Sequence, residues 1–207
     1  MYVIPLVIPP EMPKSVAGGT PAADYNIAVR QFQQQILPGG VWNTINGRAD
    51  AFLATTLWSY GRAEDVIPGG FIAPVARTVG VSFNYPAFTV ENNTAVATKV
   101  RWINDLVDGL GNFLPHLFPV DQGVHWANPP TANCNTGLPN RTDCRTNILA
   151  PYIGAVPLVT HVHGSHVQPH SDGYPEAWFL PGAPGTKGIP ASYSQRGSHY
   201  TQADNTN

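Results

Sequence analysis

Two histidines separated by one residue stand in His161-Val162-His163-Gly164. In a β-strand, residues two apart lie on the same face, about 6–7 Å apart along the chain. Two imidazoles held this way can bind one metal ion or two neighbouring ions, and imidazole suits copper, zinc, iron and nickel. Gly164 has no side chain, so a metal cluster or another backbone can come close there. By itself, the pair is more typical of surface histidines than of metal ligands.

The residues around the pair indicate a more specific chemistry. From Thr160 to Phe179 the chain resembles the first copper-binding segment of multicopper oxidases, in the branch of bacterial spore-coat laccases and bilirubin oxidases. In that family, His-X-His-Gly leads through a short loop into Ser-Asp-Gly-Tyr-Pro-Glu-Ala-Trp-Phe, which stands here at 171–179. The match places Trp and Tyr, which are rare residues, at fixed offsets, so chance does not account for it.

The resemblance to this family extends upstream. The segment 3–10 is similar to the family's amino-terminal arm, and 55–60 is similar to its strand ending in Trp-Gly-Tyr, with a serine in place of the glycine. The segments 88–90 and 100–106 match the strand pair before the copper motif. At 84–86, Asn-Tyr-Pro replaces the family's Pro-Gly-Pro, which is a departure. The resemblance therefore covers most of the chain.

The resemblance implies roles for three residues. In this family the first His of the motif binds the type 2 copper and the second binds one of the type 3 pair, which makes His161 and His163 the expected copper ligands. The family's acidic residue, Asp172 here, lies near the trinuclear copper cluster and assists proton delivery to O₂. Such a relay makes chemical sense, because reducing O₂ to two waters consumes four protons. The implied activity couples one-electron oxidation of a phenol, a tetrapyrrole or a metal ion to four-electron reduction of O₂.

Other polar residues have simpler expected roles. His166 and His170 flank the pair at positions that the family does not use as ligands. We expect Glu176 and Trp178 to fix the loop rather than to react. Loop, surface or ion-paired positions are expected for the remaining candidates, His116, His125, His199, Arg101 and Asp105.

The composition favours short strands joined by ordered loops. Charged residues make up 12% of the chain, a low share for a protein with long helices, and there are 21 Pro and 20 Gly. Five Trp, eight Tyr and eight Phe argue against disorder over most of the length. A net charge of −2 with no basic stripe gives no support for nucleic-acid binding. No apolar run approaches the roughly 20 residues of a membrane helix.

Alternating apolar and polar residues predict strands and no helix. Strands are expected at 25–30, 54–60, 88–90, 95–104 and 156–163. In the fourth of these, Val96, Val100 and Trp102 should share one face, after a turn at Asn92-Asn93. The long stretch 105–150 should be irregular. The pattern predicts an all-β fold, and the resemblance implies a cupredoxin-like Greek-key sandwich or barrel with long irregular loops, incomplete without a partner chain.

We expect an extended N-terminal arm at 1–24 and a first cupredoxin-like domain at 25–207. In the family, the second copper motif of this domain follows soon after this point, and the type 1 copper ligands come from a later domain. Neither Cys134 nor Cys144 has the adjacent His that type 1 copper requires. Two imidazoles cannot hold three coppers. The chain is therefore expected to be inactive alone and to be completed by a second polypeptide that carries the remaining cupredoxin domains.

Two alternative functions remain open. The chain could be a non-enzymatic copper-binding or assembly protein that has half of the site. It could also be a zinc-binding β-domain that uses His161, His163 and a third ligand such as His166 or His170. Metal content and an electron paramagnetic resonance spectrum separate these hypotheses, since copper(II) gives a signal and zinc does not.

The two cysteines bear on the compartment. Cys134 and Cys144 lie in one polar, turn-rich stretch, where a local disulfide is favoured over a metal site because no Cys-X-X-Cys spacing is present. A disulfide indicates an oxidising compartment. The glycosylation sequons at 92–94 and 140–142 fit that location. We therefore expect a secreted or periplasmic protein, or one at the cell or spore surface.

Overall fold

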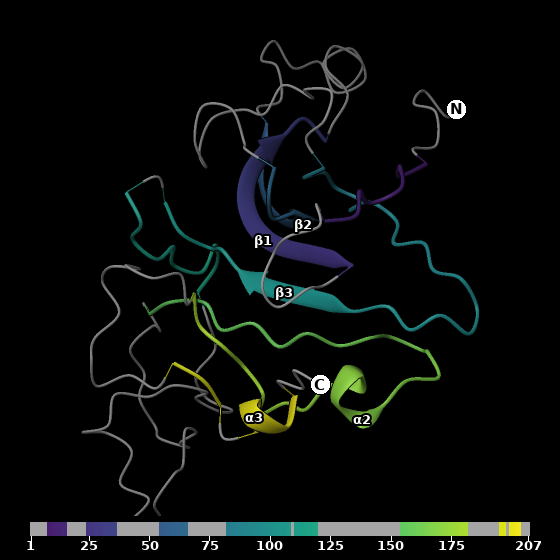
Figure 1. Ribbon diagram of the computed structural model, residues 1–207. Coiled ribbons are helices and arrows are strands. Elements are labelled where there is room, and N and C mark those ends of the chain that lie inside the picture. Colours follow the sequence, from purple (N-terminus) through teal and green to yellow (C-terminus); the bar gives the residue numbers. More distant parts are fainter. Residues whose placement is uncertain are drawn as a thin grey trace, which may run out of the picture. The chain divides into compact units, whose positions relative to one another are not determined.

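The computed structural model describes residues 8–15, 24–36, 54–65, 82–108, 110–119, 154–181, 195–197 and 199–203. In these ranges the chain forms strands β1 (Tyr25–Gln34), β2 (Thr55–Arg62) and β3 (Val100–Asn104), and two single-turn helices, α2 (Pro169–Asp172) and α3 (Tyr200–Ala203) (Figure 1). The predicted all-β class is confirmed, and the Greek-key arrangement stays a prediction. Within the described residues, no helix is both long and apolar enough to cross a membrane.

The chain divides into two compact units, Met1–Ile103 and Asn104–Asn207. Each unit has buried hydrophobic clusters of its own. The predicted arm at 1–24 and domain at 25–207 stay predictions. His125 and the predicted disulfide between Cys134 and Cys144 lie outside the described residues.

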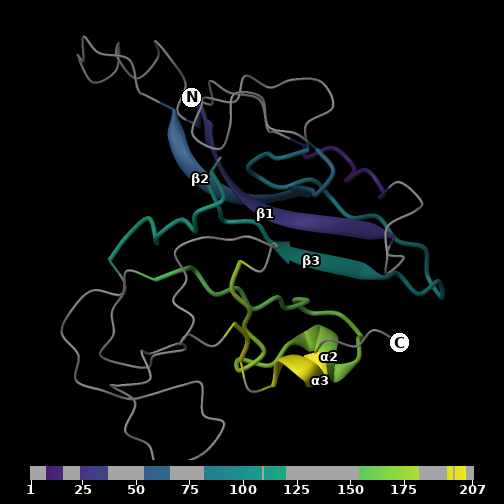
Figure 2. The same cartoon turned by 60° about the vertical axis from the view of Figure 1, so that its left-hand side comes forward.

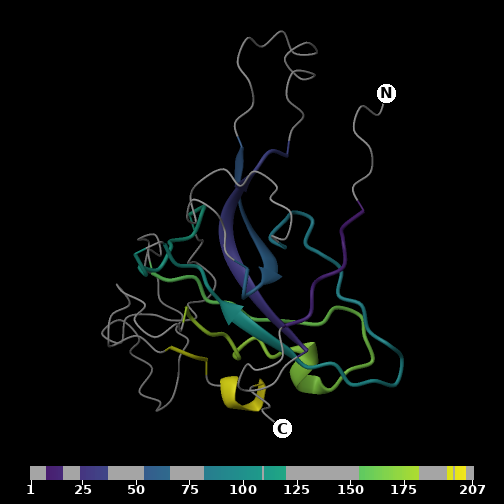
Figure 3. The same ribbon diagram turned by 45° about the horizontal axis from the view of Figure 1, so that its top comes forward.

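The first unit is built on an open three-stranded sheet with the order β2-β1-β3 (Figure 2). β1 and β2 are antiparallel, in a register that runs from the pair Ile27–Arg62 to the pair Gln34–Thr55. The two strands curve together along their length (Figure 3). Both strands are expected from their alternating, β-branched and aromatic residues; β1 continues past the predicted end at residue 30 to Gln34, and β2 begins at Thr55 and continues past residue 60 to Arg62.

β1 is the central strand because it buries side chains on both faces. Tyr25 and Ile27 pack with Met12 in one cluster, while Ala28 and Phe32 belong to a second cluster. Successive strand residues point to opposite faces, so the two clusters lie on the two sides of β1. The alternation of residues along β1 places Ala28 on the same face as the polar residues Asn26 and Arg30. That face is instead partly covered, since Ala28 is fully buried.

A buried carboxylate organises the end of β2. The side chain of Asp65 is 2% exposed and accepts hydrogen bonds from Arg62 Nε (2.8 Å) and from the backbone N–H of Ser82 (2.7 Å). Arg62 Nη2 lies 2.6 Å from the same carboxylate. The guanidinium of Arg30 donates to the carbonyl oxygens of Ala63 and Asp65. These bonds hold the turn after β2 against the segment that starts at Ser82.

The predicted strand at 95–104 is wrong in its first half. β3 begins only at Val100, and Val96 is 63% exposed instead of sharing the buried face. The N–H of Val96 donates to the carbonyl of Asn93 (3.1 Å), and Ala95 has a φ of 67°. The predicted turn at Asn92-Asn93 is present, but it extends through Ala95 and removes these residues from the ladder.

The predicted strand at 88–90 is reduced to one isolated parallel bridge between Glu11 and Thr89. The N–H of Met12 donates to the Thr89 carbonyl (2.7 Å), and the N–H of Thr89 donates to the Pro10 carbonyl (2.8 Å). Pro10 has no N–H of its own, so the ladder cannot continue in that direction. Part of the predicted extended arm therefore packs as an edge of the first unit.

The second unit is held by a short ladder of backbone hydrogen bonds. Leu158 and Phe179 donate to each other's carbonyls, at 3.0 and 2.9 Å, and Phe179 also bridges Arg196. Ala155, Trp178 and Leu180 form a buried cluster at this ladder. The described part of 105–119 is irregular, as predicted, apart from one bridge between Val107 and Phe113.

The predicted strand at 156–163 is wrong, because only Leu158 has a ladder partner. Pro157 has no N–H to donate. Further along, the N–H of Val162 donates to the carbonyl of Ser171 (2.9 Å), which belongs to helix α2 and not to a strand. Apart from the Leu158 bridge, the segment is therefore not part of a sheet, and it ends in a turn at His163.

Replacing Asp65 with alanine should destabilise the first unit strongly. The change leaves the Ser82 N–H and the Arg62 guanidinium without their buried acceptor, which costs about 2–4 kcal/mol of unfolding free energy. Urea unfolding followed by tryptophan fluorescence measures this cost. Glu64→Ala is the matched control, since Glu64 is the exposed neighbour, and it should change the unfolding free energy by less than about 1 kcal/mol. Equal effects of the two variants would contradict the account of Asp65.

Candidate metal site

His161 and His163 lie side by side although they are not in a strand. Their ring centroids are 5.7 Å apart, with an angle of 65° between the ring planes. Both side chains are exposed, while Val162 between them is partly buried. The predicted same-side placement of the two imidazoles is therefore present in the structure.

Asp172 contacts His161, chiefly through its backbone. Nδ1 of His161 hydrogen-bonds to the backbone carbonyl oxygen of Asp172, and the carboxylate Oδ1 lies 3.7 Å from the same nitrogen. A carbonyl can only accept, so Nδ1 must carry the proton. The lone pair of Nε2 is then free to bind a metal ion. An Nδ1–H donated to a carbonyl is the arrangement that orients metal-binding histidines in proteins. His161 therefore fits the chemistry of a copper ligand.

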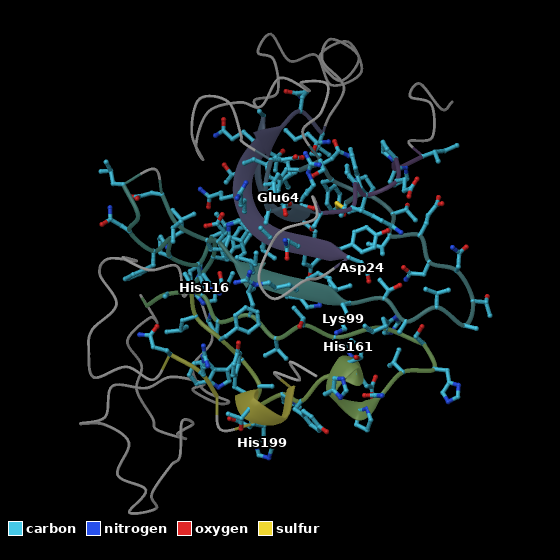
Figure 4. All side chains as sticks on the ribbon, in the orientation of Figure 1. Asp24, Glu64, Lys99, His116, His161 and His199 are labelled. Carbon is cyan, nitrogen blue, oxygen red and sulfur yellow. The ribbon has the colours of Figure 1, made fainter. Side chains whose placement is uncertain are left out.

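Helix α2, which ends at Asp172, lies next to His161 (Figure 4). The helix begins at Pro169, whose fixed φ and missing N–H suit a first helical position. It is closed by the N–H of Gly173, which donates to the Pro169 carbonyl (3.1 Å). The bond from Val162 to Ser171 holds the same turn against the histidine segment.

Gly173 permits the close approach of these two segments. Its φ is 92° with a ψ of 145°, a conformation that is essentially restricted to glycine. A Cβ atom at this position would lie 2.9 Å from the carbonyl oxygen of Thr160 and 3.4 Å from Cβ of His161. In the sequence this glycine is only one residue of the motif at 171–179. Its role in positioning His161 depends on a contact that the sequence does not display.

Gly197 and His199 donate backbone hydrogen bonds to the segment 176–178, which follows the site. Trp178 is 2% exposed, and its carbonyl accepts from the N–H of Gly197 (2.8 Å). The carbonyl of Glu176 accepts from the N–H of His199 (2.9 Å). These contacts agree with the expectation that Glu176 and Trp178 fix the loop.

Among the described residues, the other histidines form no metal-binding group with the pair. His166 is exposed, and His170 lies partly buried within α2. The ring of His199 lies 6.2 Å from the ring of Tyr174. Burial lowers the pKa of the His116 imidazole below its usual 6.5, so that ring is mostly neutral at pH 7. Across the described ranges, no group of three or more His, Cys, Asp and Glu side chains could hold a metal ion.

Gly173→Ala should disturb His161 as well as stability. The strained backbone and the contact with the Thr160 carbonyl should cost about 2–4 kcal/mol. Gly164→Ala is the matched control: Gly164 also has a positive φ, 74°, but a Cβ there meets nothing within 4 Å, so about 1 kcal/mol is expected. Urea unfolding gives both costs. Nitrogen-15 NMR of the His161 ring should show the Nδ1–H tautomer in the parent chain and in Gly164→Ala, and a loss of that preference in Gly173→Ala.

Comparison with known proteins gives one partial similarity. Over 94 residues, 45% of this chain, the sequence is 31% identical to a laccase from Bacillus stratosphericus. The match spans 13% of the laccase. No protein-family model matches the chain, and no solved structure matches it. The similarity relates part of this chain to part of a laccase, a multicopper oxidase, and it does not distinguish branches of that family.

Proposed function

We propose that this chain is the amino-terminal part of a laccase- or bilirubin oxidase-like multicopper oxidase and that His161 and His163 bind copper in it. The observation that carries the proposal is the adjacent pair of imidazoles, one of which has its Nδ1 proton directed at the Asp172 carbonyl. The similarity to a laccase supports the choice of copper over other metals that imidazole binds. Copper bound there would supply the one-electron chemistry that couples oxidation of a donor to reduction of O₂ to water.

Each residue of the site has a distinct role in this proposal. His161 and His163 donate ring nitrogens to the type 2 and type 3 coppers of a trinuclear cluster. The backbone carbonyl of Asp172 orients His161, which leaves the carboxylate available for another task. That carboxylate is 68% exposed, so water can reach it and it can pass protons toward the cluster. Asp172 would thus serve the site twice, through two different groups.

The rest of the copper site must come from protein outside these 207 residues. Two imidazoles cannot hold three coppers, and a type 1 copper needs a Cys-His pair that this sequence lacks. We therefore propose a second polypeptide that carries the remaining cupredoxin domains. The electron donor would be a phenol, a tetrapyrrole or a metal ion. A secreted or surface location belongs to the same proposal.

The test measures copper content and oxygen consumption of the chain purified with its bound partners from its own cells. The complex should contain copper and consume O₂ with a phenolic donor, and the chain alone should consume none. His161→Ala combined with His163→Ala should lower oxygen consumption at least about 100-fold, because the cluster loses two ligands.

A double variant, His166→Ala with His170→Ala, is the matched control. It also removes two nearby imidazoles, and it should keep both the copper content and the activity. Full activity of the isolated chain, or unchanged activity after loss of His161 and His163, would contradict the proposal. Copper bound by the chain without oxidase activity in any complex would support a non-enzymatic copper-binding protein instead.

A further inference from the structure

A buried asparagine connects the two ends of the loop that carries the candidate metal site. Asn104, the last residue of β3 and the first of the second unit, is 3% exposed. Its Nδ2 donates to the carbonyl of Val156 (2.8 Å) and to the carbonyl of Phe179 (3.0 Å). Its Oδ1 accepts from the N–H of Leu106 (3.4 Å). The amide group therefore uses both of its donor hydrogens on two segments that are separated in the sequence.

Those two segments are the ends of the loop that carries the site. Val156 stands five residues before His161, and Phe179 stands seven residues after Asp172. The Phe179 carbonyl accepts two hydrogen bonds, one from Asn104 Nδ2 and one from the N–H of Leu158, both 3.0 Å long. The side chain of Asn104 thus continues the short ladder that joins the start of the loop to its end.

The loop has no core of its own that could set its geometry. From 159 to 176, none of the side chains is buried. A segment with so little apolar burial depends for its order on hydrogen bonds and on the points where it joins the folded unit. The amide of Asn104 acts at both of those points at once. A side chain without donors there would leave two buried carbonyls with fewer partners.

We propose that Asn104 is a positioning residue for the metal site: it holds the two ends of the loop together and so fixes the placement of His161 and Asp172. The proposal rests on the proposed copper-binding function, since copper(II) is the probe of the site's geometry. Asn104 does not touch the metal. It acts through the backbone of Val156 and Phe179.

The first experiment compares Asn104→Ala and Asn104→Asp with the parent chain, by hydrogen exchange and by titration with copper(II). Aspartate keeps the acceptor for Leu106 but cannot donate, so it removes the two bonds to the carbonyls with little change of shape. Both variants should speed exchange of the Leu158 and Phe179 amides about tenfold or more. Both should weaken copper(II) binding about 10- to 100-fold, the range seen when a residue that supports metal ligands is lost.

Asn84→Ala is the matched control. Asn84 is also buried, and its Nδ2 donates to the Pro86 carbonyl (2.9 Å) in the first unit. This variant should lower overall stability without changing copper(II) affinity or the exchange of Leu158 and Phe179. If Asn104→Asp binds copper(II) and protects these amides as the parent does, or if Asn84→Ala impairs both as much as Asn104→Ala, Asn104 is not a positioning residue.

The experiments distinguish failure of the proposed copper-binding function from failure of the proposed role of Asn104. If the parent chain binds no copper(II) at His161 and His163, the proposed function fails. Faster exchange confined to Leu158 and Phe179 would then still support the role of Asn104 in the loop. The parent chain gives a test that needs no variant: NMR couplings across the hydrogen bonds should link the Asn104 Nδ2 protons to the carbonyl carbons of Val156 and Phe179. Absence of both couplings would overturn the proposal.

Discussion

The paired backbone of Leu158 and Phe179 is the interaction on which the candidate site depends. It joins the two ends of a loop in which no side chain between 159 and 176 is buried. Hydrophobic burial stabilises a protein in proportion to the apolar area removed from water, so this loop gains little from it. Its geometry must come from hydrogen bonds. The buried cluster of Ala155, Trp178 and Leu180 provides the rigid base to which those bonds attach.

Within the loop, polar groups of the backbone do most of the positioning. The carbonyl of Asp172 sets the tautomer of His161, and the carbonyl of Ser171 holds the N–H of Val162. A metal site needs such outer contacts because an imidazole that rotates freely loses affinity for its ion. The exposure of both imidazoles is consistent with a site that is completed by other ligands.

The first unit, unlike this loop, is stabilised mainly by hydrophobic burial. β1 buries side chains on both faces, and its partners are the long, well-paired strand β2 and the shorter β3. Asp65 is a buried polar residue of this unit. Its carboxylate accepts hydrogen bonds from the side chain of Arg62, at the end of β2, and from the backbone N–H of Ser82. Order in this unit comes from burial supported by a few buried polar contacts. In the loop that carries the candidate site, by contrast, hydrogen bonds order the chain although no side chain between 159 and 176 is buried.

The sequence by itself determined the all-β class, strands β1 and β2, and the identity of the histidine pair, since each rests on a local pattern of residue types. It did not determine where β3 begins or that Leu158 alone of 156–163 has a bridge partner, because strand pairing depends on a partner segment far away in the chain. Asn104 and Gly173 show the same limit at the candidate site. An asparagine at the end of a strand and a glycine in a motif are ordinary in sequence. Only the tertiary structure brings the amide of Asn104 to the two ends of the loop and the Cα of Gly173 close to His161, because hydrogen bonds and close contacts depend on distances in space.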